Sequence, residues 1–282
     1  MPRFAYVNGR YVPHPDAAVH IEDRGYQFAD GVYEVVPVQN GRMIDEEPHL
    51  DRLDYSLREL RIAWPMSRAA LKLVLRELTR RNGLTNGLVY LQVTRGVAPR
   101  DHKFPKAAKP ALVVTTKRMN PTPAALVERG VRVIAVPDIR WKRCDIKSVS
   151  LLPNVLGKQK AAEAGAFEAW QVDAEGFVTE GTSTNAWIVT SDGALVTRNA
   201  DAAILNGITR QAVIRLTNEV GVAFEERPFS LAEAKAAREA FLTSSSGHVL
   251  PITRIDDAVV GDGKPGPVTK RLRAAYLGYV AA

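Results

Sequence analysis

The sequence predicts a mixed α/β protein in two halves, with largely antiparallel or mixed sheets. Strand patterns interrupted by Asn-Gly turns recur along the chain, which is typical of hairpins. Apolar residues at helical spacing separate them. Pro121 and Pro123 stand two residues apart, and proline interrupts both helix and sheet. We therefore expect a small N-terminal α/β domain over residues 1–118, a linker over 119–125 and a larger C-terminal domain over 126–282.

Two hairpins open the first half. Residues 4–12 form a strand pattern with a turn at Asn8-Gly9, which predicts a tight hairpin. A second strand, 31–38, runs toward another such turn at Asn40-Gly41.

Helices follow these hairpins. The first carries an apolar stripe at helical spacing, made of Leu50, Leu53, Leu57 and Leu60. The second begins after Ser67, a good capping residue, and ends at Asn82-Gly83. Two apolar strands, 88–95 and 111–116, complete the half.

The second half alternates the two patterns. We expect strands at 131–136, 168–172, 186–190 and 194–197. We expect helices up to Arg129, over 153–166 and 209–220, after Ser230 and after Pro267. The run 143–148 is predicted to be a strand or extended segment.

Composition excludes several classes of protein. Of 282 residues, 46% are hydrophobic and 24% charged, as in globular proteins. No apolar run approaches the roughly 20 residues that cross a bilayer, and the N-terminus lacks the apolar core of a signal peptide. The single cysteine excludes an internal disulfide, argues against a zinc site and fits a reducing cytoplasm. The net charge of +7 is scattered among acidic residues, which argues against a nucleic-acid partner.

Lys147 and Glu180 are the first candidates for chemistry. Lys147 is flanked by Ile146 and Ser148, and a desolvated lysine amine can attack a carbonyl carbon. Taken alone, a lysine is more often a solvated surface charge. Glu180 precedes a Gly-Thr-Ser-Thr stretch and could pair with a protonated ring nitrogen, although a turn acid is the common case.

Two stretches could hold a phosphate. Gly207, Ile208 and Thr209 open a helix, where free amides favour an anion. The polar run 243–247 offers further amides and hydroxyls. Taken alone, an ordinary helix start capped by Asn206 explains the first stretch equally well, and an ordinary polar loop is the commoner explanation of the second.

Four further residues could bind a substrate or cofactor. Arg100 and His102 share a proline-bracketed loop, and arginine suits the capture of a carboxylate. Arg52 on an early helix and Tyr33 in the second hairpin are the other two, and each could equally be a surface or packing residue. Cys144 has no histidine nearby in sequence and is expected to be an inert thiol.

Together these stretches resemble the class IV (fold-type IV) pyridoxal-phosphate aminotransferases, and within them the bacterial D-amino acid transaminases. The resemblance spans nearly the whole chain. It is carried in order by the motifs at 23–35, 49–53, 92–96, 99–102, 143–148, 180–185 and 204–210. Several independent motifs in one order are more specific than any single motif.

The resemblance implies a role for each candidate. Lys147 matches the Schiff-base lysine, Glu180 the acid at the pyridine nitrogen, and Leu205 the residue packed on the cofactor ring. The phosphate cup is matched by Arg52, Ile208, Thr209 and Ser244 or Ser245, with Ser246 an alternative because the loop match is loose. Tyr33, Arg100 and His102 match the trap for the substrate α-carboxylate. In the family the arginine-histidine loop reaches across a homodimer interface, and the cofactor, pyridoxal 5′-phosphate, lies in the cleft between the domains.

Two departures and several alternatives accompany the resemblance. Ala29 stands where glycine is usual, which is tolerable if its φ is negative, and Trp187 replaces a tyrosine or phenylalanine. The expected activity is ping-pong transfer of an amino group from a D-amino acid such as D-alanine to a 2-oxo acid such as 2-oxoglutarate. The same fold supports branched-chain L-amino acid transaminases, (R)-selective amine transaminases and aminodeoxychorismate lyase. A catalytically inactive pyridoxal-phosphate-binding protein is the non-enzyme alternative.

Overall fold

The computed structural model describes residues 2–281 as two compact units. Unit 1 contains the described residues up to Asn120 together with Ile146–Ser150. Unit 2 contains Pro121–Asp145 and the described residues from Leu151 onward. The chain therefore returns briefly to unit 1 after it has entered unit 2.

Unit 1 is built on a six-stranded antiparallel sheet. Its strand order is β2-β1-β6-β5-β3-β4. The strands are β1 (Phe4–Val7), β2 (Arg10–Pro13), β3 (Gly31–Gln39), β4 (Arg42–Met43), β5 (Gly87–Thr94) and β6 (Ala111–Arg118). Both predicted hairpins are confirmed, because β1 pairs with β2 and β3 pairs with β4 around the two Asn-Gly turns. Asn8 and Gly9 have φ values of 46° and 95°, as such a turn requires.

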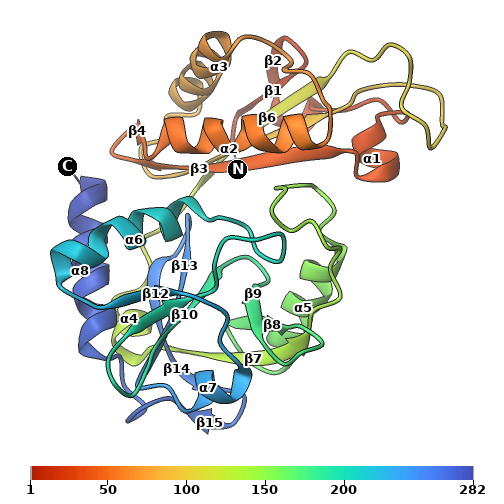
Figure 1. Cartoon of the computed structure of the whole chain (residues 1–282). Helices are drawn as coiled ribbons and strands as arrows, with labels where there is room; N and C mark the ends of the chain where they lie inside the picture. The colour runs from red at the N-terminus through yellow and green to blue at the C-terminus, as the bar shows by residue number, and fades with distance from the viewer. Residues whose placement is uncertain (1, 282) are drawn as a thin grey trace. The chain divides into compact units, whose positions relative to one another are not determined.

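Two long helices bury most of their leucines against this sheet. They are α2 (Glu46–Glu59) and α3 (Arg68–Arg81), and Figure 1 shows α2 running alongside β3. Ser67 caps α3 by accepting a hydrogen bond from the Ala70 amide, as predicted. Six leucines of these helices join strand residues in one core, whereas Leu73 of α3 is 66% exposed. Leu60, placed on the stripe by spacing, is only partly buried because α2 ends one residue before it.

A short helix, α1 (Arg24–Phe28), and a 3-10 turn, η1 (His14–Asp16), complete unit 1. The sequence did not predict α1. Asp23 caps it by accepting from the Gly25 amide, and Ala29 ends it with a φ of 54°. The condition under which alanine would be tolerated here, a negative φ, is not met, because the chain turns from α1 into β3 through a left-handed residue.

The segment 146–150 lies against the start of β3. Ser148 forms an isolated bridge with Val32, and the Val149 amide donates to the Gly31 carbonyl oxygen at 3.0 Å. Ile146 is buried in the unit 1 core. The expectation of a strand or extended segment over 143–148 was wrong for its first part, since residues 144–145 turn, residue 146 bends and only a single bridge, at Ser148, follows.

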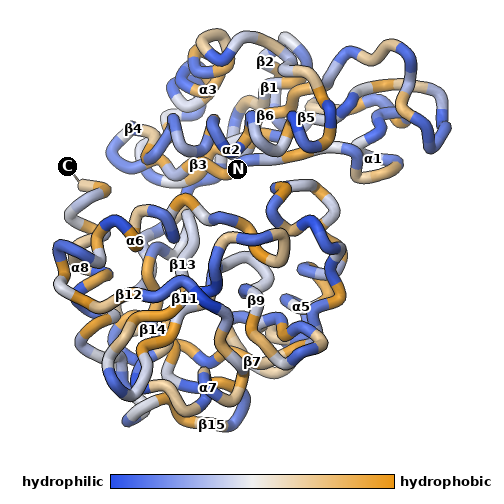
Figure 2. Tube along the Cα trace, in the orientation of Figure 1, coloured by the Kyte–Doolittle hydropathy of each residue, from blue (hydrophilic) through white to orange (hydrophobic). Residues whose placement is uncertain are grey.

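Unit 2 is built on a nine-stranded mixed sheet. The order is β12-β11-β10-β13-β14-β7-β8-β9, with β15 paired to β14. The strands are β7 (Val131–Pro137), β8 (Glu168–Val172), β9 (Val178–Gly181), β10 (Asn185–Val189), β11 (Leu195–Thr197), β12 (Phe224–Glu226), β13 (Glu239–Ser244), β14 (His248–Ile255) and β15 (Ala258–Val259). Parallel pairing joins β14 to β7, β7 to β8 and β11 to β12. Figure 2 shows apolar residues gathered along β7 and β14.

Five helices accompany this sheet among the described residues. They are α4 (Ala124–Arg129), α5 (Leu152–Glu163), α6 (Ile208–Val220), α7 (Leu231–Lys235) and α8 (Pro267–Ala281). Helices α6 and α8 contact each other (Figure 1), and α5 packs on β8. Ser230 caps α7 as predicted. Between residues 2 and 281, no helix combines the length and apolarity needed to span a membrane.

Candidate functional site

Lys147 lies half-buried in unit 1, directly beside β3. Its amide donates to Ser56 Oγ at 3.2 Å, and its carbonyl oxygen accepts from the Tyr33 amide at 3.0 Å. The Lys147 Nζ lies 4.2 Å from the centre of the Tyr33 ring, which stacks on Tyr90 at 5.7 Å. Two predicted site residues, Lys147 and Tyr33, are thus in contact.

Arg52 is held by a buried carboxylate that the sequence did not single out. Arg52 Nε and Nη2 donate to the two oxygens of Glu34 at 2.8 and 2.9 Å. His49 Nδ1 lies 2.7 Å from Glu34 Oε2, and Glu34 is completely buried. Burial opposes ionisation of Glu34, but the charge and hydrogen bonds of Arg52, with those of His49, lower the pKa of this carboxyl well below its usual range. Burial lowers the pKa of His49, so its neutral ring donates Nδ1–H to the carboxylate.

Arg100 and His102 lie exposed on the loop after β5. The Arg100 guanidinium lies 4.8 Å from the centre of the Phe28 ring, and the His102 ring lies 5.3 Å from the same centre. A shared aromatic platform therefore brings the two predicted carboxylate ligands together.

Glu180 occupies β9 in unit 2 and accepts hydrogen bonds on both oxygens. Arg140 Nη1 donates to Oε1, while Asn185 Nδ2 donates to Oε2 at 3.1 Å. The Leu205 amide also donates to Oε2, at 3.1 Å. Leu205 was expected beside a cofactor ring, and the structure brings its backbone to Glu180.

Arg140 is the clearest residue that the sequence reasoning missed. It is almost fully buried, and its Nη2 donates to Asp138 Oδ2 at 2.7 Å. Burial works against the charge of Arg140, yet Glu180 and Asp138 raise the pKa of this guanidinium overall. Burial likewise opposes ionisation of Asp138, but Arg140 lowers the pKa of that carboxyl. A pair of charged residues just after an apolar strand, here β7, was the signal available in the sequence.

The start of α6 has the form expected of an anion site. Gly207 precedes the helix, and no side chain caps the first-turn amides. A Cβ on Gly207 would lie 2.1 Å from Asn185 Oδ1, so the backbone there must be glycine. Ile208 and Thr209 are buried, and Thr209 Oγ1 lies 3.4 Å from the Tyr276 hydroxyl.

The serines of the β13–β14 turn are partly tied to one another. Ser244 Oγ accepts from the Gly247 amide at 2.9 Å and lies 3.4 Å from Ser246 Oγ. Ser245 is half-buried in the same turn. Within β13, Thr243 accepts at 3.0 Å from the indole N–H of Trp187, a fully buried residue stacked on Phe241.

The chain is similar to known proteins along nearly its whole length. The model of the family described as amino-transferase class IV matches residues 31–255. A D-alanine aminotransferase from Bacillus licheniformis is 44% identical over 268 residues, covering 95% of this chain and 94% of that protein. A D-alanine aminotransferase from Staphylococcus haemolyticus is 38% identical over 275 residues, which cover 98% of this chain and 97% of that protein. The chain belongs to the class IV aminotransferase family.

A solved structure of the same fold agrees with this assignment. A branched-chain amino acid aminotransferase from T.th., solved with pyridoxamine 5′-phosphate, matches with a TM-score of 0.91 and 25% identity, covering 99% of this chain and 94% of that one. The chain is therefore an aminotransferase, and its cofactor is pyridoxal 5′-phosphate.

The residues present fit this cofactor. Lysine supplies the amine that an aldehyde requires. The uncapped first turn of α6 offers amides to a phosphate, and the charge-assisted bonds at Glu180 favour its ionised form beside a pyridinium. Lys147 lies in unit 1, whereas Glu180 and the start of α6 lie in unit 2. Protein residues alone form each of these features.

Cys144 is not suited to nucleophilic catalysis. Burial raises its pKa to about 12; Arg140 works against this rise, while Glu180 and Asp138 add to it. The thiol donates to the Trp141 carbonyl oxygen at 3.1 Å. The expectation of an inert thiol agrees with this environment.

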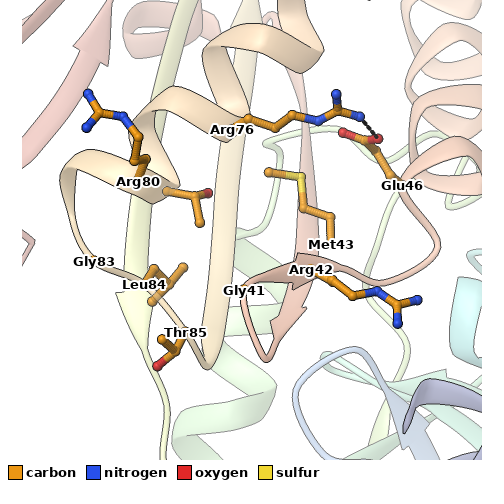
Figure 3. A pocket seen from close by; sticks show the side chains of 10 residues that line it. Gly41, Arg42, Met43, Glu46, Arg76, Arg80, Gly83, Leu84 and Thr85 are labelled. Carbon is orange, nitrogen blue, oxygen red and sulfur yellow. Dashed lines mark hydrogen bonds and ion pairs between the residues drawn. The ribbon is translucent and has the colours of Figure 1, made fainter. Parts of the chain in front are cut away.

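A separate cavity in unit 1 contains none of the predicted site residues. It has a volume of about 560 Å³ and is lined by the β3–β4 turn, α3 and the loop after α3. Figure 3 shows Arg76 pointing toward Glu46, to which it is joined by an ion pair of 3.3 Å, while Arg80 extends elsewhere. Arg80 is engaged by Glu77 at 2.7 Å, so the positive charge of this cavity is largely compensated.

Proposed function

We propose that this aminotransferase is a D-amino acid transaminase. It would move the amino group of a donor such as D-alanine to a 2-oxo acid such as 2-oxoglutarate in two half-reactions. The observation that carries the proposal is the 44% identity to a D-alanine aminotransferase over 95% of the chain. The pairing of Arg100 and His102 on one aromatic platform supports a substrate with a carboxylate.

The family resemblance assigns a residue to each part of the cofactor. Lys147 would hold its aldehyde carbon, and Glu180 its ring nitrogen. Arg52, the amides of Ile208 and Thr209, and Ser244 or Ser245 would hold its phosphate, with Leu205 against the ring. When bound, pyridoxal 5′-phosphate supplies an electron-withdrawing ring that stabilises negative charge at the substrate α-carbon.

Lys147 Nζ would carry the proton of the reaction. With substrate and cofactor bound, its free amine would accept the hydrogen of the α-carbon as a proton and would return a proton later in the same half-reaction. The Tyr33 ring at 4.2 Å restricts where the amine can lie. Glu180, fixed by Arg140, Asn185 and the Leu205 amide, keeps its negative charge in one place.

Stereochemistry would follow from the carboxylate. Arg100 and His102, with Tyr33, would fix the substrate carboxylate, and this decides which α-hydrogen faces Lys147. A guanidinium offers paired donors to a carboxylate, which a neutral surface cannot replace.

We also propose a homodimer in the cytoplasm. Helix α5 exposes an apolar stripe, in which Leu152, Val155 and Leu156 are 69%, 58% and 48% exposed. Ile139 and Trp141 add exposed apolar area in the same unit, at 61% and 44%. A patch of this kind is typical of a protein–protein interface. Light scattering of the purified holoenzyme measures the assembly, and a monomer would contradict the dimer. The single cysteine supports a reducing compartment.

A substrate panel tests the activity. Purified holoenzyme is mixed with D-alanine and 2-oxoglutarate, with L-leucine and 2-oxoglutarate, and with (R)-1-phenylethylamine and pyruvate, and the visible spectrum of the bound cofactor is followed. We expect rapid bleaching and recovery with D-alanine. The branched-chain assignment of the structural relative makes L-leucine the most informative second donor, and faster turnover of L-leucine would overturn the proposal.

A further inference from the structure

The loop that carries Arg100 and His102 is anchored by a buried ionic cluster that no prediction included. This cluster, called the Asp30 cluster below, consists of Asp30, Arg24 and Arg95. Arg24 Nε donates to Asp30 Oδ2 at 2.8 Å, and Arg95 Nε donates to the same oxygen at 2.7 Å. Arg95 Nη2 donates to Oδ1 at 2.9 Å. The side chains of Arg24, Arg95 and Asp30 are only 3%, 8% and 11% exposed.

Arg24 connects the Asp30 cluster to the loop between the two substrate ligands. Its Nη1 donates to the carbonyl oxygen of Asp101 at 2.6 Å, and Asp101 separates Arg100 from His102. Its guanidinium also lies 4.7 Å from the centre of the Phe28 ring. Phe28 is the ring against which Arg100 and His102 both lie, so Arg24 fixes the backbone and the platform of both ligands.

Arg95 fixes a second point of the same loop. Its guanidinium stacks 3.7 Å from the centre of the Phe104 ring. The remaining donors of Arg95 reach the carbonyl oxygens of Leu60 and Arg61, at 2.7 and 2.9 Å, where α2 has ended. Arg24 of α1 and Arg95 after β5 share the carboxylate of Asp30, and Arg95 also contacts the end of α2. Through these two arginines the loop is connected to all three elements.

We propose that Arg24, held by Asp30, is a positioning residue that sets the affinity of the enzyme for the substrate carboxylate. The proposal rests on the proposed D-amino acid transaminase function. The physical reason is entropic: an exposed loop that is free to move must be ordered when it binds a carboxylate, and an anchored loop is already ordered. The burial makes the anchor stiff, because movement of Arg24 away from Asp30 would leave its buried guanidinium without its counter-ion.

Arg24→Met is the direct test. It keeps an unbranched apolar stem but removes the guanidinium group, and with it the bonds to Asp30 and Asp101. We expect the KM for D-alanine to rise at least about tenfold, the value that corresponds to losing one charge-assisted hydrogen bond, while kcat changes less than about twofold. The inhibition constant of propanoate, a carboxylate without an amine, should rise in parallel because it measures the carboxylate ligands alone.

Arg132→Met is the matched control. Arg132 also joins separate segments, by donating to the carbonyl oxygens of Asp256 and Ala164 at 2.9 Å each, but it lies in unit 2. Arg132→Met should lose thermal stability but keep the wild-type KM for D-alanine and the wild-type inhibition constant of propanoate. This control separates a general loss of stability from a specific effect on the loop. An Arg24→Met enzyme that is folded and has wild-type values of both constants would overturn the proposal.

Phe28→Leu gives a second and milder test if Arg24→Met does not fold. It removes the ring under Arg100 and His102 without removing a buried charge, and the same rise in both constants is expected. Unchanged constants in this variant would also contradict the proposal. Failure of the proposed function is recognised separately, because the wild-type enzyme would then not transaminate D-alanine at all.

Discussion

The Lys147 amine lies 4.2 Å from the centre of the Tyr33 ring, and both residues belong to the same compact unit. The backbone of Lys147 is fixed independently of its side chain, through Ser56 and the Tyr33 amide. The side chain of Lys147 can therefore be changed without loss of these backbone contacts.

Lys147→Ala should abolish transamination. If Lys147 is the general base proposed above, the reaction should slow by at least the roughly 10²- to 10⁴-fold that such a group contributes. The visible absorbance of the bound cofactor should change, and borohydride reduction should no longer fix cofactor to the chain. The control is Lys142→Ala, since Lys142 is exposed nearby. Retained turnover in Lys147→Ala would contradict the assignment.

Glu34→Gln should weaken both stability and cofactor binding. The substitution removes the charge that faces Arg52, whose side chain is 9% exposed. Removal of one partner of a buried ion pair costs about 3–5 kcal/mol of unfolding free energy, measurable by urea denaturation. Release of pyridoxal 5′-phosphate on dilution should become faster, because Arg52 loses its orientation. Glu47→Gln, at a side chain that is 57% exposed, should change stability by less than about 1 kcal/mol.

Stability should fall as the pH is lowered from 7.5 toward 5. Burial lowers the pKa of His49 in the folded protein, and burial with Arg273 lowers that of His248. The unfolded chain therefore binds more protons in the range below its own histidine pKa of about 6.5. The contribution of these histidines is present above that value and is lost as the pH falls through it. His49→Gln should flatten the dependence of the unfolding free energy on pH, and a slope equal to that of the wild type would contradict the buried, neutral ring.

Cys144 should resist alkylation in the native state. With a pKa raised to about 12, its thiolate fraction at pH 8 is far below that of an ordinary cysteine. Iodoacetamide should react at least about a hundredfold more slowly than with the unfolded chain, where the pKa is about 8.5. Mass spectrometry reads the modification directly, because Cys144 is the only cysteine. Equal rates in buffer and in urea would exclude the buried environment.

Ala29→Gly should stabilise the protein. Ala29 has a φ of 54°, a conformation that costs an L-residue about 1–2 kcal/mol. Glycine removes this strain but loses about 0.5–1 kcal/mol through chain entropy, so a net gain of about 0.5–1 kcal/mol is expected. Ala274→Gly, at a position inside α8, should instead destabilise by about 1 kcal/mol. Thermal denaturation of both variants distinguishes backbone strain from a general effect of glycine.

The elements with strong local signals were predictable from the sequence. The Asn-Gly turns force a left-handed backbone, the leucine spacing favours a helix, and Ser67 satisfies a first-turn amide of α3, so these elements formed as expected. The ordered motifs likewise indicate the family from the sequence alone, and the family model confirms it. The local pattern gave a wrong prediction at the start of 143–148. A β-branched residue between polar ones suggested an extended segment, but the chain turns there.

The supporting residues were decided only by the tertiary structure. Glu34 meets Arg52, Arg140 meets Glu180, and Asp30 joins Arg24 to Arg95. The partners in these pairs are not at helix or strand spacing along the chain, so no periodic pattern in the sequence predicts that they meet. A charge acquires its role from what is buried around it, and burial is a property of the folded chain. The sequence therefore determined the family and the residues proposed to carry its chemistry, whereas the fold decided which other charges contact them.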